Sequence, residues 1–181
     1  MKNIFSFFWE TAKVIIIALV IVVPIRYFVF QPFFVKGQSM DPSFENGDYL
    51  IVDEISYLFL APKRGEVIVF KYPKNPSQRY IKRIIGLPGE TIEVKNGQVI
   101  VSDKEGSRTL DESDYLPLGT QTFKDIQITL GKDEYFVLGD NRLASSDSRS
   151  WGALGKEFIV GRVFVRAWPV AAFAKIEAPA Y

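Results

Sequence analysis

A long uncharged apolar run near the N-terminus is the feature that most restricts what this chain can fold into. It extends from Val14 to Ile25 (VIIIALVIVVPI), and apolar residues continue from Tyr27 to Phe30 after the single charge of Arg26. A cleavable signal peptide would end in a small-x-small site, which the bulky residues after Arg26 do not provide. We therefore expect an uncleaved transmembrane helix over residues 11–30, with a buried core helix as the alternative.

The rest of the chain shows short apolar runs separated by turn residues. We expect strands over residues 49–52, 66–72, 79–85, 135–138 and 159–168. Residues 91–101 predict a hairpin, because Asn96-Gly97 is a strong two-residue turn signal. Helical segments do not alternate with these strands, so the pattern favours a mainly β, antiparallel, barrel-like domain over residues 31–181. The polar stretch near residues 102–128 is expected to form a loop-rich insertion in it.

Two absences and a charge balance restrict the chemistry. The chain has no histidine and no cysteine. A Ser-His-Asp triad is therefore impossible, as are a cysteine nucleophile and the zinc sites that cysteine and histidine build. With 22 Lys and Arg against 21 Asp and Glu, the net charge is +1. This balance gives no electrostatic case for a nucleic-acid partner.

Ser39 and Lys82 are candidates for a nucleophile and its base. Ser39 stands in VKGQSMDP, residues 35–42, and Lys82 in YIKRIIGLPGE, residues 80–90. Without histidine a serine nucleophile needs another base, and a desolvated lysine is the best known substitute. Because side chains alternate along a strand, Lys82 shares a face with Tyr80 and Ile84. These neighbours favour burial, which lowers the pKa of a lysine and suits it to act as a base.

A third segment, VLGDNRLASSDSRSWG at residues 137–152, is rich in polar and charged side chains. Asp147 and Arg149 are two residues apart and are expected to clamp this loop by a charge-assisted hydrogen bond. Each of the three segments has an ordinary alternative when taken alone. Ser39 could be a turn residue and Lys82 a solvated strand-edge residue. The third segment could be a surface turn or a cation-binding loop, although its Asp spacing does not follow the EF-hand pattern.

Together, and in this order behind an apolar anchor, the three segments resemble those of the bacterial type I signal peptidases. The similarity runs from Gln31 to Trp168 and includes GQSMDPS at 37–43, GDYLIV at 47–52 and RGEVIVF at 64–70. It continues through the Lys82 segment to GDNR at 139–142, Ser145, DSR at 147–149 and WG at 151–152. That family consists of membrane-anchored serine endopeptidases with a Ser-Lys dyad, which remove N-terminal signal peptides from exported preproteins.

The resemblance implies a role for each matching residue. Ser39 is expected to be the nucleophile and Lys82 the general base, with Ser145 hydrogen-bonded to the lysine and orienting it. A second group is expected to structure the site: Asp140, Asp147 and Arg149. The pockets for small substrate residues at −1 and −3 are expected to be lined by Phe33, Val35, Met40, Tyr80 and Ile81. No cofactor and no metal are implied.

Gly37 departs from the family pattern. Many members carry there a hydroxyl residue that donates to the oxyanion. With glycine at this position, the oxyanion hole formed by Ser39 and Gly37 rests mainly on the Ser39 backbone N–H. The alternative is that Gly37 serves the backbone, through a positive φ or through space for the substrate.

The resemblance also implies partners and a location. Residues 1–10 would be a short cytoplasmic tail, residues 11–30 a single-pass anchor in the cell membrane, and the β domain extracytoplasmic. The partners would be the lipid bilayer and secretory preproteins with small residues at −1 and −3. Two other functions stay open. One is a self-cleaving Ser-Lys protease, which the absence of an Ala-Gly dipeptide disfavours. The other is a catalytically inactive, membrane-tethered β-domain binding module, which only an activity measurement separates from the enzyme.

Overall fold

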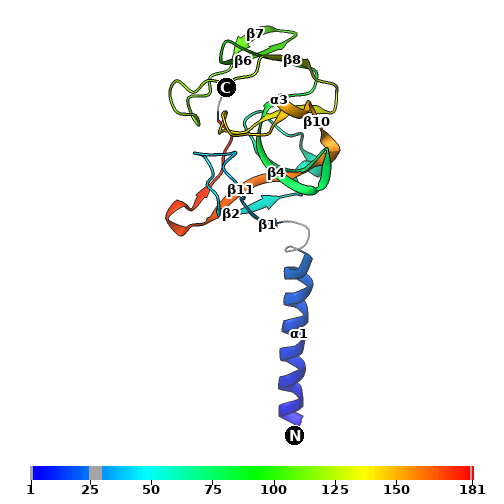
Figure 1. Cartoon of the computed structure of the whole chain (residues 1–181). Helices are drawn as coiled ribbons and strands as arrows, with labels where there is room; N and C mark the ends of the chain where they lie inside the picture. Colours follow the sequence, from blue (N-terminus) through cyan, green and yellow to red (C-terminus); the bar gives the residue numbers. More distant parts are fainter. Residues whose placement is uncertain (1, 25–29, 180) are drawn as a thin grey trace.

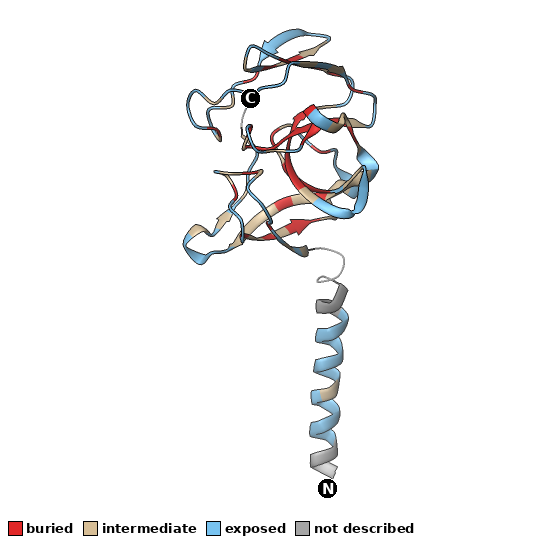
Figure 2. Ribbon diagram, in the orientation of Figure 1, coloured by how far each residue is buried: buried red, intermediate tan, exposed pale blue. Residues whose placement is uncertain are grey.

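A long N-terminal helix leads into a domain of antiparallel strands (Figure 1). This computed structural model describes residues 2–24, 30–179 and 181. Helix α1 spans Lys2–Pro24, so it covers most of the expected tail as well as the apolar run. The expected anchor over residues 11–30 includes residues 25–29, which lie outside the described residues, and its last residue, Phe30, is instead the first residue of a strand. Within the part of the chain that the structure describes, no helix has the length and apolarity needed to cross a membrane. The side chains of residues 6–20 are almost all exposed (Figure 2).

The larger of two sheets carries the three segments singled out above. Its eight strands are β1 (Phe30–Phe34), β2 (Tyr49–Asp53), β3 (Val67–Tyr72), β4 (Asn75–Gly86), β9 (Glu134–Leu138), β10 (Leu154–Gly155), β11 (Ile159–Trp168) and β12 (Ala174–Lys175). Hydrogen-bonded neighbours follow the order β1-β2-β11-β3-β4-β9-β10, with β12 beside β11. All these pairs are antiparallel, as predicted. The path begins at β1 and ends at β10, so the expected barrel-like closure is not found among the described strands.

The smaller sheet contributes strands at both ends of the expected loop-rich insertion near residues 102–128, whereas residues 110–125 contain no strand. Its order is β7-β6-β5-β8, with β5 at Thr91–Lys95, β6 at Gln98–Asp103, β7 at Gly106–Thr109 and β8 at Ile126–Thr129. The hairpin at Asn96-Gly97 is confirmed, and both turn residues have positive φ, 51° and 80°. The sequence pattern does not reveal β7, because all four of its residues (GSRT) are exposed and a strand without a buried face shows no alternation.

Strand β1 was also not expected, because it contains Pro32 and follows the apolar run directly. Proline is tolerated in a strand at a sheet edge, and β1 is the first strand of the path. Four short helical turns complete the domain: α2 (Ser56–Phe59), α3 (Ser148–Trp151), η2 (Lys156–Phe158) and η3 (Val170–Ala172).

Three buried apolar clusters hold the strands in place. One lies under the Ser39 segment and includes Met40, Phe44 and Leu50. A second joins the two sheets, because Phe136 of β9 packs in the same cluster as Ile92 of β5. A third lies around β3, β4 and β9. The smaller sheet is therefore packed on the larger one through a shared core.

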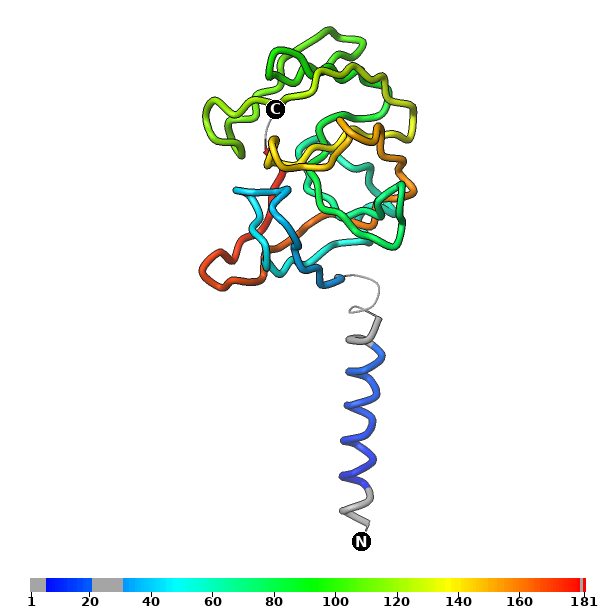
Figure 3. The backbone as a smooth tube through the Cα atoms, viewed as in Figure 1, coloured from blue at the N-terminus to red at the C-terminus, as the bar shows by residue number. Residues whose placement is uncertain are grey.

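Strand register leaves two sheet edges free beside the Ser39 segment. Residues 79–82 of β4 pair with β3, whereas pairing with β9 begins only at Arg83. Strand β1 pairs only with β2 in the described sheet. Strand β2 in turn lies beside β11, which brings the early and late parts of the chain side by side (Figure 3).

Candidate active site

Ser39 lies in the loop between β1 and β2. Val35 N donates to Asp48 O at 2.9 Å and joins the two ends of this loop. Inside it, Gly37 N donates to Asn46 Oδ1 at 2.9 Å. Gly37 has a φ of +89°, a conformation that residues with a Cβ rarely adopt. Gly37 thus has the positive φ that the backbone explanation of this glycine requires.

Lys82 is presented to Ser39 by the free edge of β4. Its Nζ lies 2.7 Å from Ser39 Oγ and donates to Ile81 O at 2.8 Å. The residue is 3% exposed. Burial lowers the pKa of Lys82 to about 8, against the charges of Asp147 and Asp140, which raise it. An amine with this pKa is neutral in roughly a tenth of the molecules at pH 7 and can accept a proton from the hydroxyl.

The third segment holds the Ser39 loop from the other side. Asn141 N donates to Ser39 O at 3.2 Å, and its Nδ2 donates to Gln38 O at 3.0 Å. The preceding residue, Asp140, is buried and accepts from Arg83 Nε and Nη2 at 2.9 and 2.6 Å. The Ser39 segment is therefore bonded to a loop that is itself ion-paired to Arg83 of β4.

Asp147 and Arg149 form the ion pair that their spacing suggested. Asp147 is fully buried and accepts from Arg149 Nε and Nη2 at 2.8 and 2.7 Å. It also accepts from Gly139 N at 3.1 Å. The pair thus fixes the backbone just after β9.

A cleft of about 880 Å³ lies over Ser39 and Lys82. One wall comes from β1 and the residues that follow it, and the other from the free edge of β4. Its charged lining residues are Lys36, Arg79 and Lys82. Among the described residues no cluster of three or more Asp, Glu, His or Cys is arranged to hold a metal ion.

Comparison with known proteins identifies the family. The family described as signal peptidase, peptidase S26, matches residues 8–168. The chain belongs to this signal peptidase family. A probable signal peptidase I-2 from Synechocystis sp. is 38% identical over 166 residues, which are 89% of this chain and 73% of the relative. The signal peptidase I of Leptolyngbya laminosa is 39% identical over 181 residues, covering 94% of this chain and 84% of the relative. A crystal structure of a signal peptidase I from Enterococcus faecalis is 30% identical and has a TM-score of 0.47, over 57% of this chain and 97% of that chain.

Membership of the signal peptidase family confirms the predicted class of enzyme, a serine endopeptidase that cleaves signal peptides. Members of the family are typically associated with membranes. The mainly β, antiparallel fold is established by the strands themselves.

The structure separates the expected pocket residues of this signal peptidase into two groups. Phe33, Tyr80 and Ile81 line the cleft. Val35 and Met40 are not among its lining residues; like Ile81, they are almost fully buried and lie in the core cluster beneath the cleft. Their side chains are directed into the core because the Ser39 loop needs apolar attachments on its inner side.

Ser145 does not form the hydrogen bond to Lys82 that the resemblance implied. Its Oγ is buried and has no hydrogen-bond partner among the described residues. The Lys82 amine is instead bonded to Ser39 Oγ and Ile81 O. Ser145 nevertheless lies at the site, because a Cβ on Gly139 would meet both Ser145 Oγ and Ser39 O.

Three polar residues of the site were not assigned a role from the sequence: Arg83, Asn141 and Arg142. The alternation of β4 places Arg83 on the face opposite Lys82, but nothing in its neighbourhood indicates a buried partner 57 residues away. Asn141 and Arg142 stand in the GDNR motif, which offers the only sequence signal for them.

Proposed function

We propose that this signal peptidase acts through a Ser-Lys dyad formed by Ser39 and Lys82. The observation that carries the proposal is the 2.7 Å distance between Ser39 Oγ and the Nζ of a buried lysine with a pKa of about 8. A serine is a weak nucleophile unless a nearby base takes its proton, and no histidine exists in this chain to do so.

The reaction has two stages. The neutral Lys82 amine takes the proton of Ser39 Oγ, which attacks the carbonyl carbon of the −1 residue of the signal peptide. The Lys82 ammonium then protonates the leaving amine of the mature protein, and an ester links the signal peptide to Ser39. A water molecule gives a proton to Lys82 and attacks this ester; the Lys82 ammonium then returns a proton to Ser39 Oγ as the ester bond breaks, which releases the signal peptide and restores both the hydroxyl and the neutral amine.

The oxyanion formed in each stage would be stabilised mainly by the Ser39 backbone N–H. Gly37 has no side chain that could donate to it. Its contribution would be the positive φ that shapes the loop and leaves room for the substrate, since no atom lies within 4 Å of where its Cβ would be.

Ser145 would orient Lys82 during the reaction. An ammonium has three N–H donors, and two of them have acceptors here, Ser39 Oγ and Ile81 O. The unpartnered Ser145 Oγ would accept the third once Lys82 is protonated. Asp140, Asp147 and Arg149 would keep the loop in place without taking part in proton transfer.

The substrate would bind as an extended segment between the free edges of β1 and β4. Edge strands offer unpaired backbone groups to a peptide, and side-chain pockets supply the specificity. Phe33, Tyr80 and Ile81 contribute bulky apolar side chains to the lining. Such a wall would accept small residues at −1 and −3 and exclude large ones.

We also propose that residues 11–29 form a single membrane anchor that ends before β1, with the β domain on the extracytoplasmic side and residues 1–10 in the cytoplasm. The support is the apolar run and several exposed apolar side chains of the β domain: Phe34, Leu58, Phe59, Leu60, Trp168, Val170 and Phe173. These would rest in the lipid headgroup region near the site. Protease added to intact spheroplasts should digest the β domain, and full protection would contradict this orientation.

The dyad is tested with detergent-solubilised full-length protein and one preprotein, with the cut mapped by mass spectrometry. Ser39→Ala and Lys82→Met should abolish cleavage and leave the fold intact. Lys82→Arg should also be inactive, because a guanidinium does not deprotonate in a protein. Lys132→Arg, at an exposed lysine, is the matched control and should be fully active. Substantial turnover by Lys82→Arg would refute the lysine base.

A further inference from the structure

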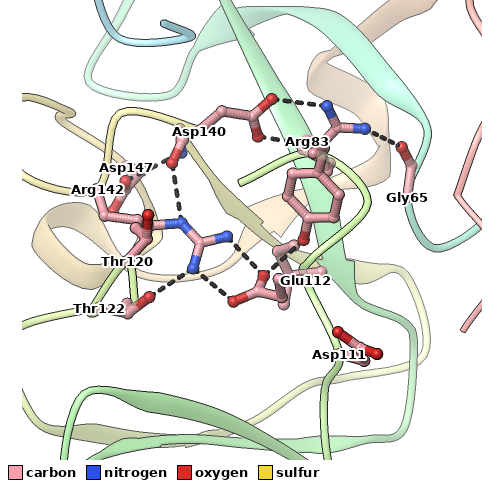
Figure 4. Close-up of polar contacts among 12 residues, drawn as sticks. Gly65, Arg83, Asp111, Glu112, Thr120, Thr122, Asp140, Arg142 and Asp147 are labelled. Atoms are coloured by element: carbon pink, nitrogen blue, oxygen red, sulfur yellow. Dashed lines mark hydrogen bonds and ion pairs between the residues drawn. The ribbon is translucent and has the colours of Figure 1, made fainter. Parts of the chain in front are cut away.

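Arg142 is a buried arginine whose partners come from the insertion. Its side chain is 1% exposed. Nη1 and Nη2 donate to the two carboxylate oxygens of Glu112 at 2.7 and 2.5 Å, and Nη1 also donates to Thr122 Oγ1 (Figure 4). On the other side of the guanidinium, Nε donates to Gly139 O at 3.1 Å. A bidentate pair of this kind fixes both position and orientation, so it ties the insertion to the backbone after β9.

A second buried arginine is held in part by the same segment. Arg83 is 4% exposed and donates to both oxygens of Asp140 and to Gly65 O (Figure 4). The ring of Tyr115 lies over its guanidinium, 4.0 Å from the central carbon. The hydroxyl of Tyr115 donates to Glu112 Oε1 at 2.6 Å. Glu112 is therefore bonded directly or indirectly to both arginines.

The two arginines fix consecutive residues of the loop that holds the nucleophile. One binds the carbonyl of Gly139 and the other the carboxylate of Asp140. The next residue, Asn141, donates to Gln38 O and Ser39 O. A continuous chain of bonds thus runs from the insertion to the catalytic serine.

We infer that the insertion is a positioning element of the peptidase and that Glu112 is its positioning residue. Glu112 fixes Arg142, Arg142 fixes the backbone of residues 139–141, and this backbone fixes Ser39 in front of Lys82. The inference rests on the dyad proposed above. A displacement of a reacting group by about 1 Å is enough to slow catalysis roughly 100-fold.

The insertion acts through Ser39 and not by contact with substrate. Glu112, Tyr115 and Thr122 are not among the residues that line the cleft. A loss of positioning should therefore lower kcat and leave KM nearly unchanged. A residue that only stabilises the fold would lower the folded fraction and leave the kcat of the folded protein unchanged.

The test compares Glu112→Ala, Glu112→Gln and Glu112→Asp with wild type in detergent, with one preprotein as substrate. Activity is measured where circular dichroism shows each variant to be folded. Glu105→Gln is the matched control, because Glu105 is exposed in the turn between β6 and β7. Ser39→Ala is assayed beside them: its full activity would refute the dyad itself, independently of the Glu112 result.

We expect kcat to fall about 10- to 100-fold in Glu112→Ala, with KM within about twofold of wild type. Glu112→Asp should retain more activity than Glu112→Gln, because only the former keeps the carboxylate opposite Arg142. An unchanged kcat in folded Glu112→Ala, or a rise in KM alone, would overturn the inference. So would unfolding of all three variants, since the pair would then serve folding alone.

Discussion

Replacing Lys82 with methionine is expected to stabilise the protein at neutral pH while abolishing its activity. Burial lowers the pKa of Lys82 from its usual 10.5 to about 8. At pH 7 the amine is charged in the folded and the unfolded chain, so the folded state carries the whole cost of burying the charge. At about 1.4 kcal/mol per pKa unit, this cost is roughly 3 kcal/mol. Methionine removes it but loses two hydrogen bonds worth about 1 kcal/mol each. The net gain should be about 1–2 kcal/mol.

The pH dependence gives this prediction its sign. Between about pH 8 and 10.5 the unfolded chain binds more protons at Lys82 than the folded chain does, so the stability of wild type rises with pH. Above that window the amine is neutral in both states and the cost disappears. Lys82→Met has no such dependence, so it should be the less stable protein near pH 11, by about 2 kcal/mol.

The assay is urea denaturation in detergent at pH 7 and pH 11, followed by tryptophan fluorescence. The difference between the two proteins cancels the titration of groups that they share. Lys132→Met serves as the control, because an exposed lysine should give no pH-dependent difference. If Lys82→Met is destabilised equally at both pH values, the Lys82 ammonium carries no burial cost and the argument for its lowered pKa fails.

Four further outcomes follow from the site. The rate constant kcat/KM should fall about tenfold per pH unit below pH 8, as Lys82 becomes protonated, and a flat profile from pH 5 to 9 would contradict the dyad. Arg149→Ala should lower the free energy of unfolding by about 3–5 kcal/mol in urea melts, because it leaves the fully buried Asp147 without its ion-pair partner; equal melts for this variant and wild type would show that the pair is not structural. Ser145→Ala should instead lower kcat with little loss of stability. Gly37→Ala and Gly37→Ser should lower kcat to the same extent, since a side chain at φ +89° costs about 1 kcal/mol or more. A kcat of Gly37→Ser well above that of Gly37→Ala would instead support a serine hydroxyl as oxyanion donor.

The strands that could be predicted are those with one buried face and clear turn signals. Residues 49–52 and the Asn96-Gly97 hairpin are examples, and both are found. Strands β1 and β7 could not be predicted, because one contains a proline beside an apolar run and the other has no buried side chain. The predicted barrel-like closure of the sheet is not found among the strands that the structure describes, because the alternation of side chains within a strand does not indicate which strands pair with each other.

Only those site residues that stand in recognisable sequence motifs could be predicted. The order of the Ser39, Lys82 and Asp147 segments gave the family, and alternation in β4 gave the burial of Lys82. The pair between Glu112 and Arg142 was not predictable, because both residue types usually lie in solvent. The burial of Met40 in the core was not predicted from the sequence, and its expected pocket role stays a prediction.

The hydrogen bonds between Asn141 and the Ser39 loop can form only after most of the chain has been synthesised. Gln38 and Asn141 are 103 positions apart, and β2 needs β11 as its neighbour. The ribosome therefore releases the serine long before the segments that hold it in place. A chain that ends before Ile159 lacks β11 and is therefore expected to lack both the ordered Ser39 loop and peptidase activity.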